Sequence, residues 1–191
     1  MTSLYLAQDK AADAFLRRDP LGLIIALVLD QQIPLERAFS APAQLADRLG
    51  VTALDAAQLA ETEPEKLATV FSQRPALHRF PGAMAGRTQA MCRIIVEQYD
   101  NDAAKVWTSA ESGAELLKRI QALPGFGKQK AKIFLALLGK QFGVTAPGWE
   151  QAAGEFGAPG SYLSVADIVD EDSLNKVREH KKAMKASAKA S

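Results

Sequence analysis

Apolar residues recur every three or four positions along most of the chain, whereas the alternation typical of strands is weak throughout. This pattern predicts an all-α protein. The expected helices cover 11–17, 21–32, 35–48, 52–59, 64–71, 84–99, 114–121, 164–168 and 172–185. One more helix is expected to start just after residue 127. Thr52 is the expected N-cap of the fourth helix, and Asp172 or Ser173 that of the last. The helix over 21–32 is so uniformly apolar that we expect it to be buried.

The turn between the helices on either side of residue 125 has the sequence Leu123-Pro124-Gly125-Phe126-Gly127-Lys128. Its two glycines allow a tight turn and a close approach to a partner. The helix that follows begins with N–H groups that have no partner within the helix, and such a terminus attracts phosphate. Lys128, Lys130 and Lys132 add positive charge at the same place. The segment therefore predicts a binding site for a nucleic-acid backbone that does not depend on base sequence.

Composition restricts the class of protein. Nearly half of the residues are apolar (48%), enough to bury a core in one domain, with two lobes, over residues 1–180. The single cysteine, Cys92, excludes an internal disulfide framework and fits a reducing cytoplasm. No apolar run is long enough to span a membrane. No cluster of His, Cys and carboxylate residues has the spacing of a metal site.

The charges are unevenly distributed, although the net charge is only +1. Acidic residues dominate 47–65, whereas basic residues gather at 74–93, at 128–132 and in the C-terminal tail over 181–191. The tail is basic and of low complexity, so we expect a frayed helix or a disordered segment that adds nonspecific affinity for DNA. The expected location is cytoplasmic, in association with the nucleoid.

A Gln31-Gln32 pair follows the most apolar helix, within the stretch from Leu27 to Ile33. Together with the turn at 123–128, this arrangement resembles the HhH-GPD superfamily of base-excision-repair DNA glycosylases over roughly residues 19–155. The resemblance implies a two-lobed helical fold with a cleft between the lobes, in which the helix-hairpin-helix binds the phosphate backbone beside a lesion. The damaged nucleotide would be flipped into the cleft, and Gln31 and Gln32 would lie near the gap that it leaves.

The resemblance also implies which residues contact DNA. The expected contacts are Leu123, Gly125, Phe126, Gly127, Lys128, Lys130, Gln31 and Gln32. In this family the hairpin carbonyls often hold a monovalent cation, so Leu123 and Gly125 are the candidates for binding Na⁺ or K⁺. The iron–sulfur cluster of some members needs four cysteines and is excluded by the single Cys92. The implied partner is damaged double-stranded DNA, bound by a monomer.

The chain departs from the family at both catalytic positions. The family's aspartate beyond the hairpin falls in the stretch 143–151, which contains Gly and Pro but only one carboxylate, Glu150. Gln129 stands where bifunctional members carry a Schiff-base lysine. Lys128 and Lys130 flank it, but a shift of one position turns a helical side chain by about 100°, away from the cleft. We therefore expect a monofunctional enzyme without lyase chemistry.

Four residues are candidates for the site chemistry. Glu150 could replace the missing aspartate, or it could be a solvated glutamate at a helix start. Asp30 ends the apolar helix, where partial desolvation would raise its pKa and suit acid–base work; the alternatives are a C-terminal polar cap and a partner for a buried arginine. His78 and Trp149 are candidates for the base pocket, where they would contact or stack on a flipped base. Both also fit ordinary packing, His78 in a core cluster and Trp149 over the hairpin helix.

These observations favour a DNA glycosylase that hydrolyses the N-glycosidic bond of a flipped, damaged base with water as the nucleophile. A cationic alkylated purine is the easiest base to release, so it needs the least stabilisation from a carboxylate that is not at the family's usual position. Alkylated bases are therefore the favoured substrates. The alternative is a non-catalytic protein that binds DNA damage or distorted DNA and has lost the family's aspartate.

Overall fold

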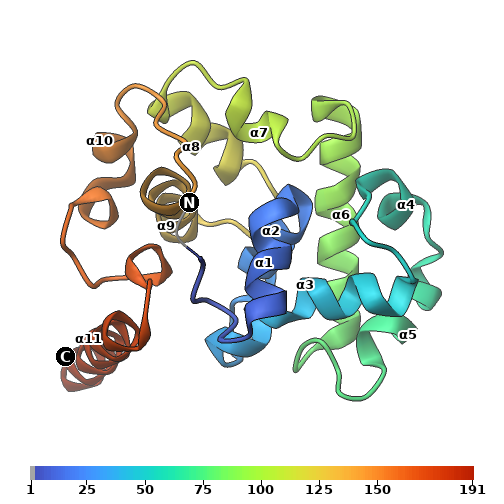
Figure 1. The fold of residues 1–191 in the computed structure, drawn as a ribbon, viewed down its shortest axis with the longest axis horizontal. Coiled ribbons are helices and arrows are strands. Elements are labelled where there is room, and N and C mark those ends of the chain that lie inside the picture. Colours follow the sequence, from blue (N-terminus) through green and yellow to red (C-terminus); the bar gives the residue numbers. More distant parts are fainter. Residues whose placement is uncertain (1–2) are drawn as a thin grey trace.

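The computed structural model describes residues 3–191, and every regular element among them is helical (Figure 1). The elements are α1 (Lys10–Arg18), α2 (Pro20–Leu29), α3 (Leu35–Leu49), α4 (Ala56–Glu61), α5 (Pro64–Ser72), α6 (Pro81–Tyr99), α7 (Lys105–Thr108), α8 (Gly113–Gln121), α9 (Lys128–Gln141), α10 (Trp149–Ala153) and α11 (Glu171–Ala190), with short 3-10 helices η1 (Gly154–Gly157) and η2 (Val165–Asp167). The prediction of an all-α protein is confirmed.

Some predicted helix boundaries are wrong because a different residue caps or ends the helix. Helix α4 begins at Ala56 because the carboxylate of Asp55, rather than Thr52, accepts the first free N–H group, that of Gln58. Helix α11 begins at Glu171 because Asp170 is its cap and accepts from the N–H group of Ser173. In both helices an aspartate is the N-cap in place of the predicted residue, because its carboxylate accepts a hydrogen bond from a free N–H group of the first turn.

Two other segments also differ from the sequence-based prediction. Helix α2 ends at Leu29 rather than at residue 32, because the chain turns back and the N–H group of Gln31 bonds to the carbonyl of Leu29. The segment 164–168 forms only the short turn η2. The basic tail over 181–191 is helical as far as Ala190, as the continuation of α11, and its residues are exposed.

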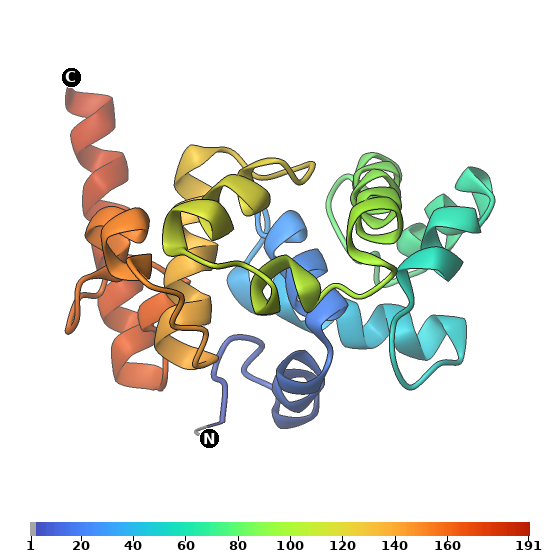
Figure 2. The same cartoon turned by 90° about the horizontal axis from the view of Figure 1, so that it is seen from above.

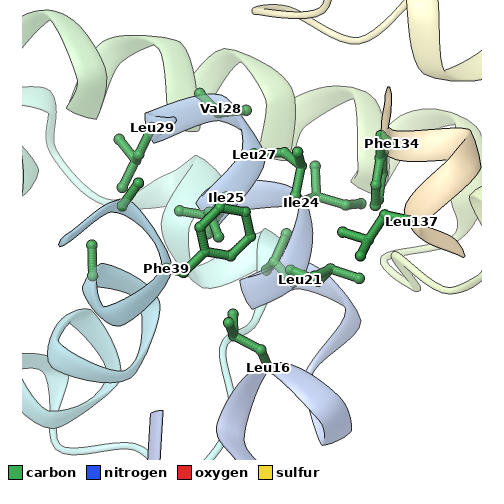
Figure 3. Close-up of a cluster of buried hydrophobic side chains, with 14 of the residues drawn as sticks. Leu16, Leu21, Ile24, Ile25, Leu27, Val28, Leu29, Phe39, Phe134 and Leu137 are labelled. Carbon is green, nitrogen blue, oxygen red and sulfur yellow. The ribbon is translucent and has the colours of Figure 1, made fainter. Parts of the chain in front are cut away.

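The helices pack in two groups that α2 holds together. Helices α1–α6 contact one another on one side of the molecule, and α8, α9 and α10 contact one another on the other side, where η1 and η2 also lie on α9 (Figure 1). Every residue from Leu21 to Leu29 is buried, which explains the uniformly apolar sequence of α2. Figure 3 shows Ile24 and Leu27 of α2 beside Phe134 and Leu137 of α9.

This apolar contact determines where the ends of the two helices meet. Burying one leucine or phenylalanine side chain contributes roughly 1.5–3 kcal/mol, so the α2–α9 contact is worth several kcal/mol. The contact brings the C-terminal end of α2 next to the first turns of α9, where Lys130 Nζ donates to the carbonyl oxygen of Leu27 at 2.7 Å. The contact therefore brings the polar residues after the end of α2 close to the polar residues at the start of α9.

A buried ion pair attaches the C-terminal segment to α9. Lys140 Nζ lies 2.6 Å from Asp167 Oδ1, and the Asp167 side chain is only 4% exposed. The other carboxylate oxygen of Asp167 accepts from the N–H groups of Leu163 and Ser164. The start of α11 is therefore placed against the same face of the protein as the α2–α9 junction.

Candidate functional site

Helices α8 and α9 form a hairpin whose turn packs on the rest of the protein. Gly125 has a positive φ of 92°, a conformation that side chains disfavour. A Cβ atom there would lie 3.2 Å from Arg87 Cδ and 3.5 Å from Val28 Cγ1, so the turn is seated on α6 and α2. Leu123 and Phe126 are buried, and the Phe126 ring stacks on Phe134 with centroids 5.7 Å apart. These two predicted DNA contacts therefore offer only backbone groups, while their side chains anchor the turn.

The exposed part of the hairpin is the N-terminus of α9. Gly127 is the N-cap and has no side chain to accept the free N–H groups of the first turn. Gly127, Lys128 and Gln129 are all exposed. The arrangement leaves N–H donors and one ammonium group available to a phosphate, as the sequence predicted for Gly127 and Lys128.

Gln31 forms the centre of a tight turn after α2. Its side-chain nitrogen donates to the carbonyl of Val28 at 2.9 Å, and its side-chain oxygen accepts from Arg87 Nη1 at 3.2 Å. Arg87 is the residue on which Gly125 packs, so the Gln31 turn and the hairpin turn share one support. Gln31, for which the sequence predicted a contact with DNA, is therefore partly buried and bonded within the protein through both polar atoms of its side chain.

His78 supports the same turn from the opposite side. Its Nδ1 atom accepts from the N–H group of Phe80 at 3.0 Å, so its Nε2 atom donates to the carbonyl of Gln31 at 2.8 Å. Burial lowers the pKa of the imidazole and keeps it neutral. Both ring nitrogens are occupied within the protein. The structure therefore places His78 in the core beneath the Gln31 turn, and not in a base pocket.

Gln32 differs from its neighbour. It is exposed and has a positive φ of 58°, which is uncommon for a residue with a side chain. The unusual backbone directs the chain out of α2 and leaves the Gln32 side chain free to contact a partner. Residues held in such conformations are often found at functional sites.

A cavity of about 460 Å³ lies beside these turns. Its walls come from the end of α2, the start of α9, the segment before η2, and α11. It is lined by Leu27, Asp30, Gln31, Gln32, Ile33, Gln129, Lys130, Ile133, Ser164, Val165, Lys181 and Lys185. The size is in the range of small-molecule binding sites, and the lining combines four aliphatic residues with eight polar or charged ones.

Asp30 and Lys130 are the two partly buried charged groups of this cavity. Burial raises the pKa of the Asp30 carboxyl, and the ammonium groups of Lys181 and Lys130 offset part of that rise. Burial lowers the pKa of the Lys130 amine, and the charge of Asp30 opposes that change. A carboxyl with a raised pKa in a cavity is typical of acid–base sites.

Lys130 corrects a prediction from helical geometry. The one-residue shift from Gln129 was expected to turn Lys130 away from the cleft, but both residues line the cavity. The cavity lies against the first turn of α9, where it is lined by the consecutive residues Gln129 and Lys130 and by Ile133. Because Lys130 Nζ donates to the Leu27 carbonyl, its ammonium group is not freely available to DNA phosphates as the sequence suggested.

Glu150 and Trp149 do not line the cavity. The Trp149 ring covers Gly139 of α9, where a Cβ atom would lie 2.4 Å from two ring carbons. Its backbone lies equally close to Gly113 at the start of α8. Glu150 is an exposed residue in the first turn of α10. The cavity thus brings together Asp30, Gln31, Gln32 and the first turn of the hairpin helix α9. The two predicted site residues of α10, Trp149 and Glu150, lie outside it.

Sequence reasoning did not identify Lys181 and Lys185 as cavity residues. Both were assigned to the basic tail, whose low complexity suggested disorder. A usable signal was present, because basic residues at positions 178, 181, 182, 185 and 189 have the spacing of one helix face. Among residues 3–191, no group of three His, Cys, Asp or Glu side chains is arranged to hold a metal ion.

A family model for HhH-GPD superfamily base excision DNA repair proteins matches residues 25–190. The chain belongs to this superfamily. The match includes the Gln31-Gln32 turn, the hairpin and α11, which are the elements around the cavity. No curated protein and no solved structure shows significant similarity to the chain.

Membership supports a role for this HhH-GPD protein in base excision DNA repair, and repair proteins of this superfamily bind DNA. The helical architecture agrees with that of the superfamily. Within residues 3–191 there is no helix with the length and apolar character needed to cross a membrane.

Proposed function

We propose that this HhH-GPD protein is a monofunctional DNA glycosylase that hydrolyses the N-glycosidic bond of a damaged, flipped base at the cavity beside Asp30. The observation that carries the proposal is the position of this carboxylate. Asp30 lines a cavity whose walls also include Gln32 and the first turn of the hairpin helix α9. A backbone-binding element and a carboxylate of raised pKa therefore lie next to one another, as base excision requires.

The hairpin would hold the DNA backbone next to the lesion. The N–H groups at the start of α9 and the Lys128 ammonium group would bind phosphate oxygens. Gln32 would fill the gap that the flipped nucleotide leaves. A monovalent cation would bind at the carbonyls of Leu123 and Gly125; the Leu123 oxygen accepts one N–H group, from Phe126 at 3.2 Å, and keeps a second lone pair for it. The partner would be damaged double-stranded DNA, bound by one copy of the protein.

Asp30 would act as the base that activates water. The ionised carboxylate accepts a proton from water as the water oxygen bonds to C1′ of the sugar, and the C1′–N bond breaks with its electron pair on the leaving base. The same negative charge stabilises the cationic character that the sugar develops in the transition state. Gln129 cannot form a Schiff base, and the Lys130 amine in the cavity is bonded to the Leu27 carbonyl at 2.7 Å. Both features support hydrolysis rather than strand cleavage.

Substitution of Asp30 tests this assignment. Asp30→Asn should lower single-turnover base release by about 10²-fold or more, because general-base catalysis is lost while DNA affinity remains. Glu150→Gln is the matched control, since it removes the exposed carboxylate outside the cavity. Base release by the unsubstituted protein should fall as the pH drops through the Asp30 pKa, with a midpoint above the ordinary aspartate value of 3.8. Loss of release in Glu150→Gln alone would transfer the role to Glu150.

A second candidate function is a non-catalytic protein that binds damaged or distorted DNA. The specific observation in its favour is that the stretch 143–151, where the family's aspartate is expected, contains Glu150 as its one carboxylate. Duplexes that carry single defined lesions separate the two functions. Tight, salt-sensitive binding to abasic or distorted duplexes without release of any base would overturn the enzyme and support the binding protein.

A further inference from the structure

The cavity is lined by more positively charged than negatively charged side chains. Three lysine side chains, Lys130, Lys181 and Lys185, line it together with one carboxylate, that of Asp30. Lys181 and Lys185 are exposed and lie one helical turn apart on α11, so both ammonium groups reach the same opening. Lys181 and Lys185 alone outnumber Asp30, so the walls of the cavity carry more positive than negative charge.

The apolar walls of the cavity are aliphatic. They are formed by Leu27, Ile33, Ile133 and Val165, and none of the described residues that line the cavity is aromatic. Aromatic faces and carboxylates attract an organic cation in proteins, whereas ammonium groups repel it. The cavity offers a cationic alkylated base one carboxylate, that of Asp30, against the lysines, and no aromatic face among the described residues, although the sequence had favoured such a base as the substrate.

The position of α11 makes this charge a fixed property of the site. Leu174 and Val177 are buried against the core, and Arg178 of the next turn lies 3.3 Å from Glu36 of α3. Lys181 follows directly after this anchored part, at the entrance of the cavity. Lys182, its neighbour in sequence, does not line the cavity.

From this arrangement we infer that the enzyme acts on neutral lesion bases with ring carbonyl groups, of which uracil is the simplest, and that Lys181 and Lys185 stabilise the negative charge on the leaving base. The inference rests on the proposed function. When the C1′–N1 bond of a neutral pyrimidine breaks, the electron pair spreads from N1 onto the carbonyl oxygens. The ammonium N–H groups donate to these oxygens, and the proton taken from water by Asp30 returns to the base.

An alkylated purine gains nothing from the same groups. Such a base carries a positive charge before the reaction and leaves as a neutral molecule, so nearby ammonium groups repel the bound state and receive no developing negative charge. The arrangement discriminates by charge, and it acts on the rate of bond cleavage as well as on binding.

Two double variants with the same change in net charge test the inference. Lys181→Gln with Lys185→Gln removes the ammonium groups at the cavity, and Lys10→Gln with Lys66→Gln removes two on α1 and α5, outside it. Single-turnover release is measured at saturating protein on duplexes that contain uracil or 7-methylguanine. We expect release of uracil, a rate at least about tenfold lower in the first double variant, and an unchanged rate in the second.

The outcomes separate this inference from the proposed function. Release of 7-methylguanine without release of uracil would overturn the substrate class and leave the glycosylase intact. Equal loss of rate in both double variants would make the net charge of the protein the cause and overturn the role of Lys181 and Lys185 in leaving-group stabilisation. Release of no base from any lesion duplex would overturn the proposed function itself. All four lysines are exposed, so circular dichroism should show both variants folded.

Discussion

At the scale of single residues, the adjacent glutamines after α2 have different roles. Gln31 is bonded through its side chain to Val28 and Arg87, so it holds the turn together. Gln32 is exposed and has a left-handed backbone conformation. Its backbone is therefore strained, whereas Gln31 stabilises the turn. A left-handed conformation costs a residue with a side chain roughly 1–2 kcal/mol, and glycine avoids most of that cost.

Gln32→Gly should therefore raise the free energy of unfolding by about 0.5–1 kcal/mol while lowering affinity for lesion-containing DNA, because the side chain that fills the gap is lost. Urea unfolding and DNA titration measure the two effects. Gln8→Gly is the matched control, because Gln8 has a similar φ of 55° and does not line the cavity. It should gain stability without losing affinity. A loss of stability in Gln32→Gly would mean that the side chain supports the turn.

At the scale of elements, helix α9 makes a different contact at each of its two ends. Its first turn forms a wall of the cavity, and its later part receives the Trp149 ring over Gly139. The sequence left two roles open for Trp149, and packing over the hairpin helix is the one that the structure has. Glycine at position 139 is required by this contact, because a Cβ atom would overlap the ring.

Gly139→Ala should lower the free energy of unfolding by about 1–3 kcal/mol, because overpacking moves the Trp149 ring. Gly86→Ala is the matched control in another helix, since nothing lies within 4 Å of a Cβ atom at that position. It should raise stability by about 0.5–1 kcal/mol, as alanine does at an open helical site. Chemical denaturation of both variants measures the difference. Equal stabilisation by the two substitutions would show that Trp149 does not pack on Gly139.

At the scale of the whole molecule, the basic groups extend beyond the compact body. Figure 2 shows the C-terminal end of α11 projecting from the rest of the protein. Arg178, Lys182 and Lys189 line an exposed basic surface on this helix, which continues from the lysines of the cavity. With a net charge of only +1, affinity for DNA depends on this local concentration of charge and on the hairpin.

Lys182→Gln with Lys189→Gln should weaken binding to damaged and undamaged duplexes alike. The slope of the logarithm of affinity against the logarithm of salt concentration should become shallower by about 2, because each phosphate contact releases roughly one counterion. Fluorescence anisotropy at several salt concentrations gives the slope. Lys10→Gln with Lys66→Gln, which carries the same charge change on α1 and α5, should leave it unaltered. A sequence-dependent loss of affinity would contradict contact with the backbone alone.

The sequence by itself determined the helical content, the position of the hairpin turn and the family resemblance. Periodicity and turn residues act over a few neighbouring positions, so Gly125, Gly127 and the apolar run 21–29 were sufficient for these conclusions. The same local reasoning misplaced the starts of α4 and α11, because several adjacent polar residues were able to cap each helix.

Only the tertiary structure decided which residues share the cavity. Asp30 and Glu150 were both plausible carboxylates by sequence, and the packing of α2 on α9 brings the first to the cavity and not the second. Lys181 and Lys185 acquire a place there only because the Lys140–Asp167 ion pair and the buried start of α11 direct that helix across the opening. Contacts between residues far apart in the chain depend on the packing of whole helix faces, which no local pattern contains.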